Sequence, residues 1–532
     1  MATAPRADQP MSATRARPGI VLRLLALMVL GVCFRFSNLD RRVYRYDEAF
    51  TKLWLCAHSA EDVRAALALN RPLPIEMLAE YKHARPGVRW RDVFDVFART
   101  EPHQAPSYVT LLWAWVQVTG DSVESLRALS ATISVLALPL AVWLGWELFG
   151  QWPSALLMGA LVAVSPIHVV YAQEARVYSL WDVSILLSSA VLLRAVRRPT
   201  SWNWSLYAVV VGVGLWIHLP SALVVLGHGL YVYGSARERQ TAEGKIAPAL
   251  MRRYLSAVLA GVLLCTPWLV NLIQQWAVAM EQMRWVGQPT AFLPYIKTIA
   301  LNFACVVFDA RLRDDNTFYY LSVPINLFMS VGLWWLVRRT PRRVWLFVVT
   351  LIGPSLAVFG LPDLVLGGVR LSVARYLFPC YIGLQLALAH WLATQMESEA
   401  RRRWQAVVAV VLAAGIVSDA AFCRAETWWT KSFSRYNWEV AHIIEQAAHS
   451  AQRPLVISDE AVGILSLSYA IDAGIDVLVV RAGDVPRVPP EYADVFVFAP
   501  QPNLQRVMAE QHWHLDPAYE RGQLWRLTRG AA

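Results

Sequence analysis

The chain is poor in the motifs that identify nucleotide-binding and redox domains. It has no Gly-x-Gly-x-x-Gly run, no Walker A loop and no internal repeat of solenoid period. Its six cysteines form neither a Cys-x-x-Cys pair nor a metal-ligand spacing. Most of them lie in apolar runs, which is typical of small buried hydrophobic residues rather than of metal ligands or reactive thiols.

A basic patch interleaved with aromatic residues is also missing, although the formal net charge is +10. We therefore expect no nucleic-acid partner, and basic residues that instead fix the orientation of a membrane protein. The composition agrees, because 56% of the 532 residues are hydrophobic against about 45–50% in soluble domains. The 24 tryptophans favour membrane–water interfaces. The sequence thus predicts a polytopic α-helical protein of the lipid bilayer.

The first apolar run extends from Gly19 to Phe36 and is long enough to cross a membrane. We expect its two charged side chains, Arg23 and Arg35, to snorkel toward the surface. No small-x-small cleavage site follows, which favours an anchored span over a cleaved signal peptide. Residues 1–18 are rich in Ala, Arg, Pro and Ser and predict a disordered cytoplasmic N-terminus.

About eleven crossings are predicted, and the short stretches 107–119 and 292–308 would raise the number to 13 if both also crossed. The ten runs after the first are 125–148, 153–167, 177–195, 203–218, 220–234, 252–271, 318–337, 343–361, 376–395 and 404–422.

Charge placement orients these crossings. Clusters of Arg and Lys lie at 194–198, 237–253, 338–343 and 401–403, and eleven crossings from a cytoplasmic N-terminus put all four in the cytoplasm. We therefore predict a multi-pass membrane protein with a cytoplasmic N-terminus, whose transmembrane domain covers 19–423.

The extracytoplasmic side then holds a long first loop, 37–124, and the chain after residue 423. The loop predicts an amphipathic helix over Val63–Tyr81. The tail, 450–532, contains the short β-type runs Pro454–Ser458, Asp476–Val480 and Asp494–Ala499, with helical stretches between or after them. It predicts a small soluble α/β domain.

The first loop opens with a pair of acids, Asp47 and Glu48. A carboxylate at a membrane surface can take a proton from an attacking hydroxyl or ligate a divalent cation. The alternative is a helix start, with Asp47 as the N-cap and Glu48 in the first turn.

Two further stretches carry basic groups. Arg176 can donate two parallel hydrogen bonds to a phosphate, with Tyr178 two residues later; interfacial anchoring is the alternative. Arg370 and Arg375 lie in a predicted outer loop, where a cation needs a ligand such as a phosphate or a salt bridge to the tail domain.

The histidines offer weaker signals. His103, two residues after Glu101, is a candidate metal ligand together with Asp47. His218 and His228 lie in apolar spans, where a histidine with satisfied hydrogen bonds in the core is the more usual interpretation.

In order along the chain, these motifs resemble a known family. The series is Arg45-Tyr-Asp-Glu-Ala49, Glu101-Pro-His-x-x-Pro-x-Tyr108, Leu126-Arg-Ala-Leu-Ser130, Glu147-Leu-Phe-Gly150, Ser165-Pro166 and Tyr171-x-Gln-Glu-Ala-Arg-x-Tyr178. It is similar to the protein O-mannosyltransferase-like bacterial glycosyltransferases, family 39 and its relatives within the GT-C superfamily. A later element, Arg375-Tyr-Leu-Phe-Pro379, resembles the Arg-Tyr motif of that family. The chain departs from it at Gln104-Ala105, where a His-Pro-Pro run is usual.

The resemblance implies a bacterial inner (plasma) membrane protein with a GT-C fold and with a polyprenyl-phosphate-linked sugar as donor. It implies that an acid in the first outer loop acts as catalytic base or metal ligand, which carries over to Asp47 with Glu48 beside it. Donor contacts carry over to basic and tyrosine groups, and the full set of expected substrate-binding residues is His103, Tyr171, Glu174, Arg176, Tyr178, Arg375 and Tyr376.

We therefore expect inverting transfer of a hexose or pentose to an acceptor hydroxyl on a lipid, glycan or protein of the cell envelope. A single displacement needs one base, because the phosphate is already a good leaving group. Arg, Tyr or a divalent cation would stabilise the charge that builds on the phosphate, and no other cofactor is expected. The alternatives are a lipid or sugar transporter or flippase, whose charges cluster near the midplane of the bilayer, and a non-enzymatic scaffold.

Overall fold

The computed structural model describes residues 18–84, 87–243, 247–312, 317–448, 453–471 and 474–529. The N-terminal segment that we expect to be disordered lies, apart from Pro18, outside the described residues. The chain forms two compact units. The helical unit contains the described residues of 1–37, 101–107 and 130–423, and the mixed unit contains those of 38–100, 108–129 and 424–532.

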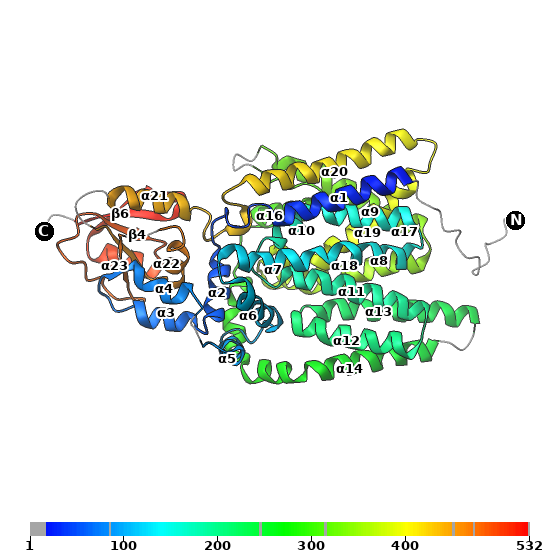
Figure 1. The fold of residues 1–532 in the computed structure, drawn as a ribbon, viewed down its shortest axis with the longest axis horizontal. Coiled ribbons are helices and arrows are strands. Elements are labelled where there is room, and N and C mark those ends of the chain that lie inside the picture. The colour runs from blue at the N-terminus through cyan, green and yellow to red at the C-terminus, as the bar shows by residue number, and fades with distance from the viewer. Residues whose placement is uncertain are drawn as a thin grey trace. The chain divides into compact units, whose positions relative to one another are not determined.

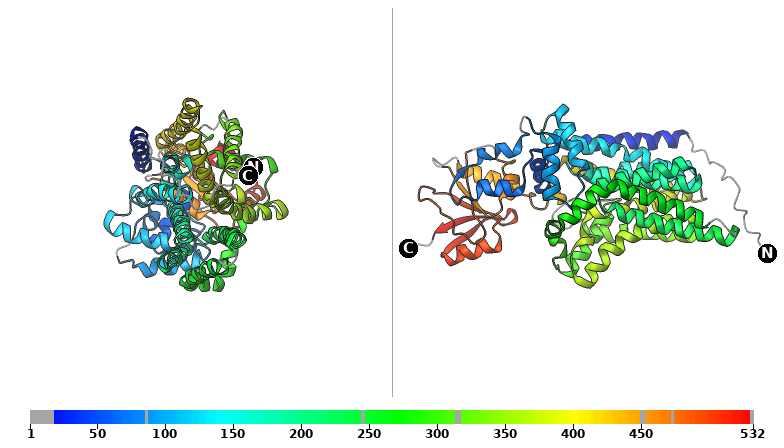
Figure 2. Two further views of the ribbon diagram at one scale, coloured as in Figure 1. Left: turned by 90° about the vertical axis from the view of Figure 1, so that its right-hand side faces the viewer. Right: turned by 90° about the horizontal axis from the view of Figure 1, so that it is seen from below.

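The helical unit is a bundle in which long helices lie side by side (Figure 1), and Figure 2 shows them end-on. Residues 130–135 of α7 (Val123–Val135) belong to it. Its other helices are α1 (Pro18–Phe36), α8 (Ala137–Phe149), α9 (Trp152–Ala163), α10 (Pro166–Ala172), α11 (Tyr178–Arg197), α12 (Ser201–Ile217), α13 (Ser221–Glu243), α14 (Ala247–Gln274), α15 (Trp276–Gln282), α16 (Phe292–Ala304), α17 (Ser322–Arg339), α18 (Arg342–Leu366), α19 (Phe378–Gln395) and α20 (Arg401–Arg424).

Burial divides these helices into two kinds. Helices α9, α10, α11 and α19 are buried along most of their length and form the centre of the bundle. By contrast, the most apolar windows of α1, α14 and α17 are 17%, 22% and 22% buried. Helices that expose so much apolar surface need a nonaqueous solvent. The fold is therefore that of a polytopic helical membrane protein.

Among the described residues, seven helices are long and apolar enough to cross a membrane, and the bent pair α9 and α10 would make an eighth. All eleven predicted runs are helical. The higher predicted number counts α12, α13 and α19 as well, which are shorter or carry polar residues. The short stretches are the 13-residue helices α6 (Ser107–Thr119) and α16, whereas a perpendicular crossing takes about 20 residues.

Contrary to the prediction, Arg35 does not snorkel toward the membrane surface. Its side chain is fully buried, and its guanidinium donates hydrogen bonds to the carbonyls of Ala163 (2.7 Å), Val162 (3.0 Å) and Gly31 (2.9 Å). The chain bends by 52° between α9 and α10, and the last carbonyls of a helix have no partner within the helix. Arg35 supplies that partner at the bend.

The mixed unit is built on one six-stranded sheet with the order β1-β3-β2-β4-β6-β5. β2, β3 and β4 run parallel, and β1, β5 and β6 pair antiparallel at the edges. The strands are β1 (Leu73–Pro74), β2 (Leu455–Ser458), β3 (Asp476–Val479), β4 (Val495–Phe498), β5 (Trp513–Tyr519) and β6 (Leu524–Arg529). The helices are α2 (Tyr46–Leu55), α3 (Ala60–Leu67), α4 (Ala79–Lys82), α5 (Trp90–Thr100), most of α6, the start of α7, α21 (Asn437–Ala448), α22 (Ala461–Leu467) and α23 (Pro502–Glu510).

The three predicted strands of the tail are confirmed as β2, β3 and β4. Apart from Ser458 and Asp476 at their ends, they are apolar because both faces of the sheet are covered. Alternate residues, such as Val456 and Val477, pack against α2, α3, α21 and α22. Their neighbours, such as Ile457 and Leu478, pack against α23. The core of this unit is thus made jointly by the first loop and the tail.

The single amphipathic helix predicted over Val63–Tyr81 is wrong. Helix α3 ends at Leu67, and the chain then forms strand β1, a 3-10 turn over Ile75–Leu78 and α4. Pro72 and Pro74 break the pattern, because proline lacks the amide donor that a helix interior needs. The apolar residues are instead buried against the sheet.

Candidate active site

A short loop of the helical unit, residues 101–107, brings polar side chains to the start of α11. The Gln104 amide donates to Glu101 Oε2 (2.9 Å), and Arg176 donates to Gln104 Oε1 (3.3 Å). His103 Nε2 lies 3.6 Å from Glu101 Oε2. Burial, together with the positive charges of Arg176 and Arg375, lowers the pKa of His103 to about 4. His103 is therefore a neutral imidazole at pH 7, beside two cations.

Arg176 lies in the turn that joins α10 to α11 and is 7% exposed. Its amide donates to the Glu174 carbonyl (2.7 Å), and its own carbonyl accepts from Ser130 Oγ (3.3 Å). The Gln173 amide nitrogen holds the same turn by donating to the carbonyls of Phe34 and Ser37. The backbone of this turn is bound on both sides, so the position of the guanidinium is well defined.

Arg375 faces three aromatic rings. Its guanidinium carbon lies 5.5 Å from the ring centroid of Trp285 and 5.8 Å from those of Tyr178 and Tyr376. Tyr376 in turn stacks on Phe359 at 5.3 Å. Cation–π contacts of this kind hold a guanidinium in place while its N–H groups can still donate in the ring plane.

The remaining predicted substrate-binding residues lie around this group. The Tyr171 ring contacts the Tyr178 ring edge-on at 5.3 Å. Tyr171 and Glu174 are 3% and 1% exposed, so they support the site from within. We call His103, Arg176, Tyr178, Arg375 and Tyr376 the basic–aromatic cluster. Its five members come from three separate segments and meet at one end of the helical unit.

Arg370, the other arginine of the predicted outer loop, has a structural partner. It donates to Asp363 Oδ1 (2.8 Å). The other carboxylate oxygen of Asp363, Oδ2, accepts from the Leu371 amide and the Tyr295 hydroxyl. The observed partner of this cation is therefore Asp363 of the helical unit, and not the tail domain as one of the two alternatives expected.

His218 and His228 differ in their surroundings. His228 is bonded on both ring nitrogens, to Ser189 (3.1 Å) and Tyr207 (3.0 Å), as predicted for a core histidine. Neither ring nitrogen of His218 has a hydrogen-bond partner among the described residues, although both are buried. The His218 ring lies 6.3 Å from Tyr178 and 4.8 Å from Trp181. It thus borders the basic–aromatic cluster with unsatisfied polar atoms.

The paired acids lie in the mixed unit, at the start of α2, and their environments differ. Asp47 forms an ion pair with Arg45 (2.9 Å), and its side chain is 20% exposed. The Glu48 side chain is 0% exposed and accepts from Arg127 (2.7 and 2.8 Å), Lys431 (2.9 Å) and the Arg45 amide (3.0 Å).

These surroundings decide the charge of Glu48. Burial alone would raise the pKa of Glu48, but Arg127 and Lys431 outweigh it and hold the pKa well below its usual range. A carboxylate so firmly ionised and enclosed has little tendency to take up a proton. The geometry of Glu48 therefore favours a structural role, as the acid that joins α2, α7 and the segment after α20.

Comparison with solved structures identifies the architecture. ArnT from Cupriavidus metallidurans, in the apo state, matches with a TM-score of 0.52 at 12% identity, over 97% of this chain and 99% of that chain. The same protein bound to undecaprenyl phosphate matches with a TM-score of 0.51, also at 12% identity, over 97% and 100%. The fold is that of ArnT.

The ArnT likeness concerns the fold. No protein-family model matches the sequence, and a search of curated proteins finds no match either. An oligosaccharyltransferase of Archaeoglobus fulgidus, solved with a tethered acceptor peptide, aligns over 86% of this chain and 64% of its own. Its TM-score of 0.43 at 11% identity is too low to add to the ArnT comparison.

The described residues of this ArnT-like chain contain no preformed cluster of metal-ligating side chains. No group of three or more His, Cys, Asp or Glu side chains gathers there in a way that could hold a metal ion. The expected divalent cation therefore stays a prediction, and no step of the reaction proposed below uses one.

Sequence reasoning missed two neighbours of the cluster. Trp285 lies in a 3-10 turn (Arg284–Gly287) far from the motifs in sequence, and one tryptophan among 24 carries no signal of its own. For His218 the sequence predicts a core residue, because this histidine lies in an apolar span. Its position at the C-terminal end of α12, rather than inside the helix, is the signal that distinguishes it from His228.

Proposed function

We propose that this protein transfers a sugar, with inversion, from a polyprenyl-phosphate donor to an acceptor hydroxyl at the extracytoplasmic face of a bacterial plasma membrane. The ArnT-like fold supports the proposal, since one solved ArnT is bound to undecaprenyl phosphate. The closer resemblance to family 39, and the hexose or pentose that it implies, belong to the same proposal.

The observation that carries the proposal is the basic–aromatic cluster. Two arginines, Arg176 and Arg375, lie close enough to His103 to lower its pKa, and the first of them is almost completely buried. Two guanidinium groups at one site suit a phosphate, because its several oxygens can accept their parallel hydrogen bonds.

The proposed reaction needs little from the protein beyond charge and position. The acceptor oxygen attacks the anomeric carbon, and the bond from that carbon to the phosphate oxygen breaks. The polyprenyl phosphate leaves with the electron pair, and Arg176 and Arg375 stabilise the negative charge that develops on it. His103, being neutral, can donate a hydrogen bond without adding a third charge. Asp47 takes the proton of the acceptor hydroxyl.

Asp47, rather than Glu48, is the proposed base. Asp47 keeps part of its carboxylate exposed, whereas Glu48 is sealed by two cations. A carboxylate can act as the base only if one of its oxygens is exposed, because that oxygen has to reach the acceptor hydroxyl.

The distribution of charge supports the proposed orientation. The loops α11–α12, α17–α18 and α19–α20 lie at the same end of the bundle (Figure 1) and carry arginine clusters. Helix α11 begins at Tyr178 in the basic–aromatic cluster and ends at Arg197. The cluster and the basic loops therefore occupy opposite ends of that helix, and by the positive-inside rule the cluster faces away from the cytoplasm.

The proposed base is tested by Asp47→Asn in membranes supplied with a polyprenyl-phosphate sugar. We expect transfer to fall roughly 10²- to 10⁴-fold, the usual contribution of a general base, with the yield of folded protein unchanged. Asp40→Asn, which alters an exposed carboxylate of the same loop, should keep the wild-type rate. Glu48→Gln should instead lower the amount of folded protein, because it leaves Arg127 and Lys431 without their anion.

Transfer by Asp47→Asn at the wild-type rate would remove Asp47 as the base. The same assay separates transfer from transport. A transferase releases free polyprenyl phosphate as donor is consumed, and a flippase leaves the donor intact.

The proposed donor site is tested by Arg176→Ala. We expect the apparent KM for the donor to rise by roughly tenfold or more, since a hydrogen bond to a charged group contributes about 1.5–3 kcal/mol, while the KM for the acceptor changes little. Arg402→Ala, in the exposed basic cluster at the start of α20, should leave both constants unchanged. An unaltered donor KM in Arg176→Ala would contradict the assignment.

A further inference from the structure

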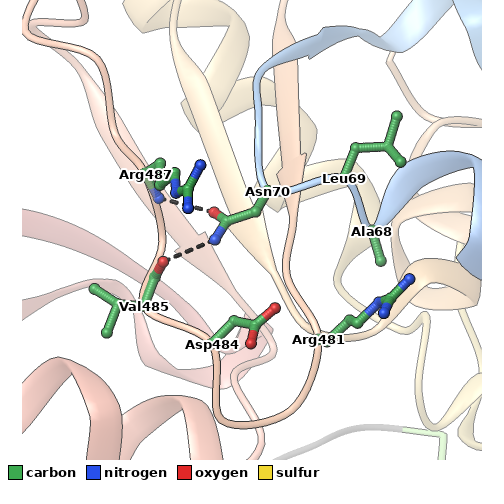
Figure 3. A pocket seen from close by; sticks show the side chains of 7 residues that line it. All are labelled: Ala68, Leu69, Asn70, Arg481, Asp484, Val485 and Arg487. Carbon is green, nitrogen blue, oxygen red and sulfur yellow. Dashed lines mark hydrogen bonds between the residues drawn. The ribbon is translucent and has the colours of Figure 1, made fainter.

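The mixed unit contains an open hollow of about 570 Å³ that belongs to neither the basic–aromatic cluster nor the paired acids. One side of it is the turn between α3 and β1, and the other is the loop that follows β3. Figure 3 shows the side chains of Arg481, Asp484 and Arg487 around Asn70. The volume lies within the range of small-molecule sites, about 300–1,000 Å³.

The position of the hollow in the sheet favours ligand binding. β3 runs parallel to β2 and ends at Val479, and the lining residues 481–487 follow directly. The carboxyl ends of the parallel strands are the side of an open α/β sheet on which ligands bind, with the switch point of this sheet between β2 and β4. The first loop of the chain closes one side of that crevice with Ala68, Leu69 and Asn70.

Asn70 holds the loop in one conformation. Its amide nitrogen donates to the Val485 carbonyl (2.9 Å), and its amide oxygen accepts from the Arg487 amide (2.8 Å). The backbone of Asn70 is left-handed, with φ of 53°, a conformation that asparagine tolerates better than most residues. Both polar atoms of the Asn70 side chain are engaged by the loop. We therefore assign Asn70 the role of positioning the loop rather than binding a ligand.

The charged side chains of the hollow are available. In the part of the chain that the structure describes, the side chains of Arg481, Asp484 and Arg487 make no hydrogen bond or ion pair, and all three residues are exposed. A second hollow of this unit, of about 300 Å³, differs in this respect. There Lys52 pairs with Asp121 at 2.8 Å and Lys82 lies over the Tyr469 ring, so these charged side chains already have partners.

We propose that this hollow binds a phosphorylated sugar. Two guanidinium groups suit a phosphate. A simple phosphate ion would be repelled by Asp484, whereas a sugar offers hydroxyl groups that donate to this carboxylate. Leu69 and Val485, 46% and 42% exposed, provide apolar surface for the C–H groups of the ring.

Binding is tested by titration calorimetry of the detergent-solubilised full chain, without donor, using glucose 1-phosphate, glucose and inorganic phosphate as probes. We expect glucose 1-phosphate to bind most tightly. The double variant Arg481→Ala/Arg487→Ala should weaken its binding at least about tenfold, as expected for lost charge-assisted contacts. Arg506→Ala, an exposed arginine on α23 of the same unit, should bind like the wild type, and Asn70→Ala should bind more weakly because its loop is no longer held.

The proposal is overturned if the double variant binds glucose 1-phosphate as tightly as the wild type, or if the wild type does not bind it. Inorganic phosphate binding as tightly as glucose 1-phosphate would overturn the sugar assignment. Since the titration contains no donor, its result is independent of transfer. A protein that binds the probe but releases no polyprenyl phosphate from donor would refute the proposed function and leave this site standing.

Discussion

At the scale of single residues, two histidines that both lie in apolar runs of the sequence differ in their hydrogen bonds. His228 is bonded to Ser189 and Tyr207, whereas neither nitrogen of His218 finds a partner among the described residues. A buried polar group without a partner costs about 1–3 kcal/mol. Such groups often mark a position where a ligand or water completes the hydrogen bond. Because Tyr178 and Arg375 are near, we expect this ligand to be the proposed donor.

His218→Phe should therefore stabilise the fold and, in the same variant, weaken donor binding. Removal of the unsatisfied nitrogens is expected to raise the free energy of unfolding by about 1–3 kcal/mol and to raise the donor KM. Thermal unfolding in detergent and donor titrations measure the two effects. His228→Phe is the matched control and should lower the unfolding temperature, because it breaks two hydrogen bonds. A lower unfolding temperature in His218→Phe would count against this interpretation.

At the scale of elements, the bend between α9 and α10 depends on a side chain of α1. Gly31 allows α1 to approach α9 so closely that a Cβ at this position would collide with the Ala163 carbonyl. Arg35, one helical turn later, can then reach the carbonyls of Val162 and Ala163. The bend precedes the turn that carries Arg176, so α1 also helps to position the cluster.

Arg35→Met should destabilise the helical unit by at least about 2 kcal/mol, since it removes charged hydrogen bonds to buried carbonyls. The measurement is the unfolding temperature of the detergent-solubilised protein. Arg23→Met, which alters the exposed arginine of the same helix, should have no such effect. Equal unfolding temperatures for the two variants would show that the carbonyls at the bend do not need Arg35.

At the scale of the whole molecule, the mixed unit is assembled from segments that lie far apart in the chain. Its larger core combines Val63, Leu67 and Ile75 of the first loop with Val456 and Val477 of the tail. β1 from the first loop also pairs with β3 from the tail. The two segments are separated in sequence by most of the transmembrane helices, so the fold of this unit has many nonlocal contacts.

A fragment comprising 450–532 alone should therefore fail to fold, because one face of its sheet would lose its cover. We expect poor dispersion of its amide resonances and no cooperative melting. A single chain in which a flexible linker joins 38–129 to 424–532 should melt cooperatively, because it restores the shared core. Cooperative melting of the short fragment would contradict the role assigned to the first loop.

The sequence predicted those features that depend on local pattern. Long apolar runs predicted the helices. In lipid, unpaired backbone N–H and C=O groups cost free energy, and a helix pairs them within the segment itself. Apolar runs of four to five residues predicted β2, β3 and β4. The ordered motifs predicted the residues of the basic–aromatic cluster, His103, Arg176, Tyr178, Arg375 and Tyr376, because they carry the charge and ring types that a phosphate needs.

Tertiary structure decided which partner each polar side chain finds. Asp47 and Glu48 are adjacent in sequence, yet Glu48 meets Arg127 and Lys431 from distant segments while Asp47 stays partly exposed. In the same way, Trp285 joins Arg375, and Pro72 and Pro74 turn an expected helix into a strand of the tail's sheet. Hydrophobic burial is encoded in the residues themselves, whereas the pairing of charges depends on distances that exist after the chain has folded.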